Sequence, residues 1–337
     1  MRVFAVPQTG YHDHKTGSIH AVIQAVVGTA VQAVMTAQPG AELRSEASKS
    51  ALLAGVPMAI GTGRVPVLRV LGRNAGLMTG PGTNSYLIGT QRLALVDPGP
   101  ADPEHIDAVL RILAGRSLGW IFVTHTHGDH SPGTLELQQR TGAQVIGLSA
   151  PVDSPHQDQT FKPARIYRDG EIVSCGEFRM RLVHTPGHVS NHFCYLLEEE
   201  GMLFTGDHIL EGTTPVILPP DGNMRHYLES LAKVKALPVV SLAPGHGRLM
   251  EEPRNVIDTL IRHRLRREQK TLTGLMELSR DAGEVSLESL ALRVYDDVPP
   301  HLLPWAQRTL LAHLIKLEDE GRVARQGEHW TGVTAHV

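Results

Sequence analysis

The sequence predicts an α/β fold with two β-sheets between two layers of helices, a four-layer αββα sandwich, followed by a C-terminal winged-helix domain. Three observations support this prediction. Short apolar runs of strand length alternate with helical patterns throughout residues 61–267. Turn signals rich in Gly and Pro separate these runs. In residues 268–337, three helical patterns precede a hairpin signal, which is the element order of a winged helix.

Bulk composition limits the classes of protein to consider. The chain has 337 residues, enough for one large domain and a smaller companion. The formal net charge of −3 excludes a bulk attraction for nucleic acid or an anionic membrane, so such binding would need a local patch. Residues 1–60 are rich in Ala, Gly, Gln and Ser with weak periodicity, and we expect an N-terminal extension of uncertain order there.

From residue 65 onward the pattern sharpens. The turn signals G-P-G-T and G-T-Q separate the first three strands. In the first helix, Ile106, Val109 and Leu113 recur on one face. The fourth strand, W-I-F-V-T, is short and apolar and runs directly into a histidine cluster. The elements expected here are strands at 65–72, 83–89, 92–97, 120–124 and 143–148, and helices at 103–113 and 134–141.

The second half continues this alternation and ends in a different module. Its elements are strands at 171–173, 178–184, 193–198, 202–205 and 239–244, and helices at 225–235 and 253–270. The C-terminal module adds helices at 271–279, 287–295 and 304–320. In the last of these, Leu310, Leu314 and Leu317 share one face, and Gly321 supplies the C-terminal stop. The hairpin expected over 322–331 turns at its Gln-Gly pair.

Membrane and redox signals favour a cytoplasmic protein that does not enter a membrane. No apolar run reaches the ~18 residues of a membrane-spanning helix, and the stretch at 21–35 is a poor signal peptide. The two cysteines, Cys175 and Cys194, lack metal-type spacing, which fits a reducing compartment.

The main functional signal is the histidine cluster T-H-T-H-G-D-H on the loop after the strand at 120–124. His125 and His127 are two residues apart, so they can project the same way from an extended backbone. Asp129 and His130 follow, and they can face a second centre. Imidazole nitrogen and carboxylate oxygen are ligands that zinc takes, and they also suit iron or manganese. The cluster therefore predicts a metal site.

Three further loops each offer one ligand. His188 lies in H-T-P-G-H, Asp207 in F-T-G-D-H and His246 in A-P-G-H-G. Each follows an apolar run and is flanked by Gly or Pro, which lets the backbone turn sharply and present one side chain. Because all four loops follow an apolar run and offer His or Asp side chains, we expect their ligands to form one site.

H-x-H-x-D-H followed by T-P-G-H, G-D and P-G-H-G resembles the metallo-β-lactamase superfamily, over residues 65–267. The resemblance implies a binuclear metal centre. One ion would be held by His125, His127 and His188. The other would be held by Asp129, His130 and His246. Asp207 would bridge the two ions.

The resemblance implies a hydrolase with two metal ions, zinc being expected and iron or manganese also suited. Paired cations ~3.5–4 Å apart lower the pKa of a shared water toward neutrality and so supply hydroxide. Asp129 is the expected catalytic residue, because its carboxylate can orient the nucleophile and receive its proton. Asp97, in L-V-D-P-G-P, matches the family's first motif and is expected to orient ligands without binding metal.

Subgroup patterns narrow the resemblance. One group of antibiotic-hydrolysing enzymes has Cys where Asp207 stands and another lacks a bridging carboxylate, so Asp207 argues against a dedicated β-lactamase. P-G-T-N-S-Y-L-I-G, G-D-H-I-L-E-G-T-T and I-R-H-R-L-R-R-E-Q, with the winged helix, resemble the beta-lactamase-like protein 2 group. Its members are known as endoribonucleases that prefer single strands, although V-I-L-P-P-D-G-N-M differs from the animal members. Single-stranded RNA is therefore the implied substrate.

A basic segment in the helix at 253–270 favours a phosphodiester substrate. Its cations are Arg262, Arg264, Arg266, Arg267 and Lys270. Such a cluster can contact phosphates, although charge runs are as often solvated helix faces. The expected substrate contacts are His263 and Arg264, which match the family's His-Arg pair, and Asn84 beside a ligand loop.

Two alternatives stay open. A small-molecule hydrolase acting on a thioester, ester, lactone or β-lactam would use the same metals, with the winged helix narrowing the mouth. A nucleic-acid-binding module without catalysis is the other, since winged helices often insert a helix into the major groove. The third C-terminal helix ends in E-D-E, however, which is a poor surface for phosphate. The oligomeric state, including a homo-oligomer, also stays open.

Overall fold

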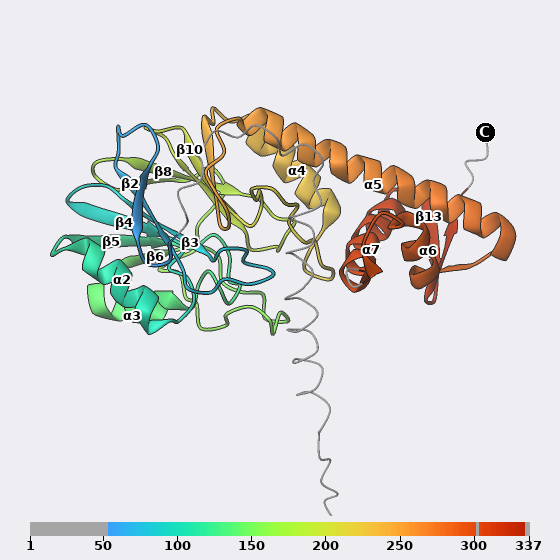
Figure 1. The fold of residues 1–337 in the computed structure, drawn as a ribbon, viewed down its shortest axis with the longest axis horizontal. Coiled ribbons are helices and arrows are strands. Elements are labelled where there is room, and N and C mark those ends of the chain that lie inside the picture. Colours follow the sequence, from blue (N-terminus) through green and yellow to red (C-terminus); the bar gives the residue numbers. More distant parts are fainter. Residues whose placement is uncertain (1–52, 301–302, 334–337) are drawn as a thin grey trace, which may run out of the picture.

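The structure is a computed structural model that describes residues 53–300 and 303–333 (Figure 1). Two sheets occupy one end of the molecule, and the C-terminal elements form a second module at the other end. The first sheet has the strand order β1-β2-β3-β4-β5-β6, and the second has the order β11-β10-β9-β8-β7. Helices α2 and α3 cover the first sheet, and α4 with the start of α5 covers the second. The predicted αββα sandwich is therefore confirmed.

The bounds agree closely with the sequence pattern. The first sheet consists of β1 (Pro57–Ile60), β2 (Val67–Leu71), β3 (Asn84–Ile88), β4 (Arg92–Val96), β5 (Ser117–Phe122) and β6 (Gln144–Ile146). The second consists of β7 (Ile172–Ser174), β8 (Arg179–His184), β9 (Phe193–Leu197), β10 (Met202–Gly206) and β11 (Ser241–Pro244). The covering helices are α2 (Pro103–Leu113), α3 (Gly133–Thr141), α4 (Met224–Lys235) and α5 (Pro253–Ala282).

Apolar side chains fill the spaces between the layers. Between the sheets, Phe122 of β5 packs edge-on against Tyr195 of β9, with ring centroids 5.1 Å apart. Ile106 of α2 packs against the outer face of the first sheet, and Leu231 of α4 against that of the second. Full burial of each such side chain contributes about 1.5–3 kcal/mol. These layers fix the positions of the strand ends, which hold the candidate site.

Helix α5 corrects one prediction. The separate helices expected at 253–270 and 271–279 form one continuous helix, Pro253–Ala282. Gly274 lies within this helix at a point where α6 packs closely, since a Cβ there would lie 3.3 Å from Cγ of Arg293. In Figure 1 this long helix connects the sandwich to the C-terminal module. It crosses residues 267 and 268 without a break, and the domain division there stays a prediction.

The C-terminal module is a winged helix. It contains the end of α5, α6 (Leu287–Val294), α7 (Leu303–Asp319) and a sheet of order β12-β14-β13. The predicted hairpin is formed by β13 (Val323–Gln326) and β14 (His329–Gly332). The sequence pattern missed β12 (Val285–Ser286), and it missed β1, which pairs antiparallel with β2.

Residues 1–52 of the expected N-terminal extension, including the stretch at 21–35, lie outside the described residues. Among the described helices, none is both long enough and apolar enough to cross a membrane.

Candidate metal centre

The site lies where strands of both sheets end. The loop with His125 and His127 follows β5 of the first sheet. His188 follows β8, Asp207 comes directly after β10, and His246 follows β11, all in the second sheet. All the ligands expected from the sequence therefore come together in space, in two neighbouring groups.

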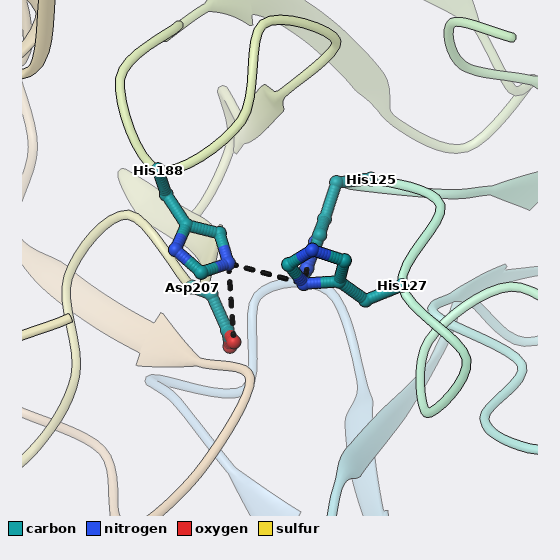
Figure 2. Close-up of side chains that lie close together, drawn as sticks. All are labelled: His125, His127, His188 and Asp207. Atoms are coloured by element: carbon teal, nitrogen blue, oxygen red, sulfur yellow. Dashed lines mark hydrogen bonds and ion pairs between the residues drawn. The ribbon is translucent and has the colours of Figure 1, made fainter. Parts of the chain in front are cut away.

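The first group contains three imidazoles and one carboxylate, from His125, His127, His188 and Asp207, and their candidate ligand atoms lie within 4.8 Å of one another. His127 Nδ1 lies 2.9 Å from His125 Nε2 and 3.2 Å from His188 Nε2. His188 Nε2 also lies 3.7 Å from Asp207 Oδ2. Figure 2 shows these side chains pointing toward a common centre, with His125 and His127 on one loop and His188 and Asp207 on two other segments.

The second group contains Asp129, His130 and His246. Asp129 Oδ2 lies 3.2 Å from Nε2 of both His130 and His246. Asp207 also contacts this group through its other oxygen, because its Oδ1 lies 3.4 Å from His130 Nε2 and 3.3 Å from His246 Nε2. The two oxygens of Asp207 thus face different groups, as a bridging ligand requires.

Asp97 lies next to the candidate ligands, and its role in orienting them stays a prediction. It is buried at the end of β4, and its carboxylate accepts three hydrogen bonds. The donors are Thr124 N at 2.7 Å, Thr124 Oγ1 at 2.8 Å and His130 Nδ1 at 2.8 Å. The bond from His130 leaves Nε2 free to face Asp129 and Asp207. Asp97 itself has φ of 51°, in a left-handed region that Asp tolerates better than most residues.

Two other candidate ligand histidines donate their second ring N–H to backbone carbonyls. His188 Nδ1 donates to the carbonyl of Val216 at 2.6 Å, and His246 Nδ1 donates to that of Gly82 at 3.1 Å. Histidines that bind metal commonly donate their second ring N–H in this way, which fixes the ring orientation and the tautomer.

Two further residues that support the candidate ligands were not predicted from the sequence. Thr83, buried directly before β3, donates from Oγ1 to Asp129 Oδ2 at 3.0 Å. Gln157 accepts from Thr126 Oγ1 at 2.5 Å and donates to Asp221 Oδ2 at 2.7 Å, so it connects the histidine loop to the loop before α4. Thr83 lies within the P-G-T-N-S-Y motif, which could have indicated it. Gln157 lies in an irregular segment without any sequence signal.

The charges of the site are strongly coupled. Burial lowers the pKa of His127 to about 3, assisted by His188. Burial also opposes protonation of His246, but Asp207 and Asp129 raise its pKa to about 10. The pKa of Asp129 is held well below its ordinary value, because the attraction of His130 and His246 outweighs the effect of burial. Without metal, the carboxylates are therefore ionised and balanced by protonated histidine.

The donor atoms fit metal ions. His130 Nε2 and Asp207 Oδ1 are buried, and neither makes a hydrogen bond although they face each other. Unpartnered polar atoms are rare in protein interiors because each costs about 1–3 kcal/mol. A cation coordinated by these nitrogen and oxygen atoms would satisfy both of them.

The three residues expected to contact substrate are not among the candidate metal ligands. Asn84 is buried, and its amide donates to the carbonyls of Pro244 and Gly247, which fastens β3 to the His246 loop. Arg264 is also buried and donates to the carbonyl of Pro215. Burial lowers the pKa of His263 to about 4, so this residue is neutral near pH 7. Contact of these residues with substrate stays a prediction.

The basic segment of α5 does not converge on the metal centre. Arg267 forms an ion pair with Asp297, and Lys270 with Asp296. Arg266 and Lys270 line a groove between α5 and α6, away from the described ligands. Only part of this charge is therefore available to a polyanion.

A cavity of about 100 Å³ opens beside His188, Asp207 and His246. Its apolar lining consists of Leu77, Met78, Pro81, Leu210, Pro215 and Val216. Thr213, Thr214 and Glu211 add polar groups. Among the described residues, no Lys or Arg lines it.

Comparison with known proteins places this geometry in a family. Residues 78–246 match the metallo-beta-lactamase superfamily, and residues 286–330 match the beta-lactamase associated winged helix domain. A beta-lactamase-like protein 2 homolog of Caenorhabditis elegans is 33% identical over 258 residues, which are 74% of this chain and 82% of that protein.

An atrochrysone carboxyl ACP thioesterase of Aspergillus aculeatus is 32% identical over 273 residues, covering 77% of this chain and 82% of that protein. The fold is similar to the crystal structure of a beta-lactamase domain protein from Burkholderia ambifaria, with a TM-score of 0.70 and 20% identity, covering 86% of this chain and 96% of that one. The chain therefore belongs to the metallo-β-lactamase superfamily of hydrolases, and it also contains the beta-lactamase associated winged helix domain at its C-terminal end.

Proposed function

We propose that the protein is a binuclear metal-dependent hydrolase that cleaves thioesters of small acyl groups. The observation that supports this most is the pair of ligand groups sharing Asp207 beside a mainly apolar cavity. His125, His127 and His188 would hold one ion. Asp129, His130 and His246 would hold the other. Zinc suits this set of imidazole and carboxylate ligands, and iron and manganese are also suited.

When bound, the metal ions lower the pKa of water and stabilise negative charge on oxygen. The side chains of the chain do the remaining work. Asp129 is ionised, and Thr83 holds one of its oxygens, so its carboxylate can receive a proton from an attacking water. Asp97 accepts from Nδ1 of His130, and the Val216 carbonyl accepts from Nδ1 of His188. These hydrogen bonds hold both imidazole rings in a fixed orientation.

The cavity favours an uncharged acyl group over a phosphodiester. A phosphodiester has a negative charge that Lys or Arg commonly binds. Among the described residues that line the cavity there is no such side chain. Leu77, Met78 and Leu210 instead offer apolar contact to a few carbon atoms.

The basicity of the leaving group also favours a thioester substrate over RNA. A thiol has a pKa of about 8.5, so it can leave as a thiolate near neutral pH without a proton donor. A ribose alkoxide is far more basic and needs protonation. Relatives of this chain are named as thioesterases acting on an acyl carrier protein, which supports the same substrate class.

Single-stranded RNA, the substrate implied by the resemblance, is the second candidate. It is supported by the similarity to beta-lactamase-like protein 2 homologs, whose names give no substrate. The partial neutralisation of the α5 cations weakens the case for RNA.

A direct comparison of substrates tests the proposal. Purified protein loaded with zinc is assayed on acetyl and benzoyl thioesters of N-acetylcysteamine, a single-stranded RNA and a chromogenic β-lactam. We expect the thioesters to be cleaved with the highest kcat/KM, chelator to abolish the reaction, and Asp207→Ala to lower it by orders of magnitude. Asp153→Ala, on an exposed loop, is the control and should not change it. Cleavage of RNA without turnover of either thioester would contradict the thioesterase assignment.

A further inference from the structure

Arg264 of α5 is a buried cation without a carboxylate partner among the described residues. Its side chain is 2% exposed. Its guanidinium donates through Nη2 to the carbonyl of Pro215 and lies 5.3 Å from the ring centre of Tyr227 in α4. Burying a charged group costs free energy unless it is well paired. Within the described part of the chain, the hydrogen bond to Pro215 is the one the buried Arg264 guanidinium makes to backbone, so it fixes the position of the Pro215 carbonyl.

The next residue along this loop holds a candidate metal ligand. The Val216 carbonyl accepts the 2.6 Å hydrogen bond from His188 Nδ1. Neighbouring carbonyls of one loop are thus bound by Arg264 and by His188. Within the described part of the chain, residues 213–217 make no backbone-to-backbone hydrogen bond. Side chains therefore hold this loop, and Arg264 provides its polar anchor to α5.

The anchor also determines the tautomer of His188. With Nδ1 donating to Val216, the free nitrogen Nε2 faces His127 and Asp207, as coordination requires (Figure 2). If the Val216 carbonyl moved, the ring could turn or transfer its proton to Nε2. The first metal group would then lose one of its nitrogen ligands.

Helix α5 extends this connection to the winged helix. Glu268, four residues after Arg264, is buried and binds Lys316 of α7 at 2.9 Å and Arg322 at 3.3 Å. Ala312 of α7 belongs to the apolar core beneath α4. The C-terminal module therefore supports the part of α5 from which Arg264 reaches the loop.

We propose that Arg264 is a positioning residue for the metal centre, which anchors the Pro215–Val216 carbonyls to α5 and thereby fixes the ring of His188. This proposal rests on His188 being a metal ligand. In this role Arg264 connects the winged helix to the centre, and it holds one wall of the substrate cavity through Pro215 and Val216.

Two variants and one control test the proposal in the full-length protein. Arg264→Met keeps an unbranched side chain and removes the charge and all donors. Arg264→Lys keeps the charge, but its ammonium reaches about one bond less far than Nη2. Arg266→Met is the control, because Arg266 is exposed on the same helix two residues away. Circular dichroism and melting curves establish which variants are folded.

The first readout is zinc affinity, measured by competition with a chelator. Supporting partners of metal-bound histidines typically contribute 10–100-fold in affinity. We expect a loss of that size for one ion in Arg264→Met, a smaller loss of about three- to tenfold in Arg264→Lys, and none in the control. Wild-type affinity in every folded Arg264 variant would overturn the proposal, and if Arg264→Met fails to fold, Arg264→Lys decides.

The second readout does not need metal. In the metal-free protein, nitrogen NMR of labelled histidine, assigned with a His188→Gln variant, reports which nitrogen of His188 has the proton. We expect proton on Nδ1 in the wild type and a mixture of tautomers in the folded Arg264 variants. The same tautomer in all of them would also overturn the proposal. If the wild type bound no zinc, the metal assignment would fail instead, and loss of thioesterase activity alone would concern only the substrate.

Discussion

Replacing Asp97 with Asn tests how the histidine loop is oriented. Asp97 accepts bonds from the backbone N and the hydroxyl of Thr124 and from Nδ1 of His130. Asn has nearly the same shape, and its oxygen can keep the bond to Thr124 N. Its NH₂ group then takes the place of Oδ2 and cannot accept a hydrogen bond. The N–H of His130 would face another donor, so the ring must turn or change its tautomer.

The structure sets the size of the expected effect. One charge-assisted hydrogen bond to a ligand is lost, and such bonds are worth about 1.5–3 kcal/mol. This agrees with the 10–100-fold loss of metal affinity typical for supporting partners. We expect that loss for the ion held by Asp129, His130 and His246, and a smaller loss for the other ion, because Asp97 reaches His125 only through the hydroxyl of Thr124.

The assay is titration of the metal-free protein with zinc against a chelator, with urea unfolding measured in parallel. Asp102→Asn is the matched control, since Asp102 caps α2 through the N–H of Glu104 and Asn caps helices equally well. Equal affinities for both ions in Asp97→Asn and wild type would refute the orienting role. Equal loss at both ions, together with a collapse of the unfolding transition, would indicate a purely structural role.

Three further predictions concern separate parts of the molecule. Thr83→Val removes the donor to Asp129 and the acceptor for the Asn74 amide, so kcat should fall about 10-fold or more with a modest loss of melting temperature, whereas unchanged kcat would exclude Thr83 from the site. Against the effect of burial, the contacts of Glu268 with His313 and Lys316 lower its pKa to about 2, so they stabilise the fold fully above about pH 4.5, and the contribution is lost as pH falls toward 2. Glu268→Gln should therefore reduce the free energy of unfolding by about 1–2 kcal/mol at pH 7, with the difference shrinking below pH 4; a constant difference would contradict this. Charge reversal of the exposed Arg262 and Arg266 should leave thioester turnover unchanged, and a marked loss would contradict a cavity that does not use them.

The proximity of the candidate ligands could be predicted because these residues lie in short local motifs. H-x-H-x-D-H places its ligands on one loop after a strand, and each remaining ligand follows an apolar strand with Gly or Pro beside it. Strand ends in a layered α/β fold converge, so the pattern indicates proximity as well as residue type. The agreement of α2 with its predicted bounds has a similar local cause, since Asp102 and Pro103 mark its start.

The features that could not be predicted from the sequence depend on tertiary contacts, which leave no local sequence pattern. Arg264 lies in a run of cations typical of a solvated helix face, yet its side chain points inward to Pro215. Helix α5 continues past residue 270 because packing against α6 stabilises it, which periodicity within the helix does not show. Gln157 acts through partners far away in sequence. For the same reason, the residues that line the cavity could be identified only from the structure.

Counting the metal ions in the purified protein tests the metal centre most directly. Elemental analysis after removal of loosely bound metal should give close to two transition-metal ions per chain, as expected of a paired site. In Asp207→Ala, whose two carboxylate oxygens face both ligand groups, the count should fall while the fold persists. At most trace metal in the wild type, with hydrolysis indifferent to chelators, would contradict the proposed centre.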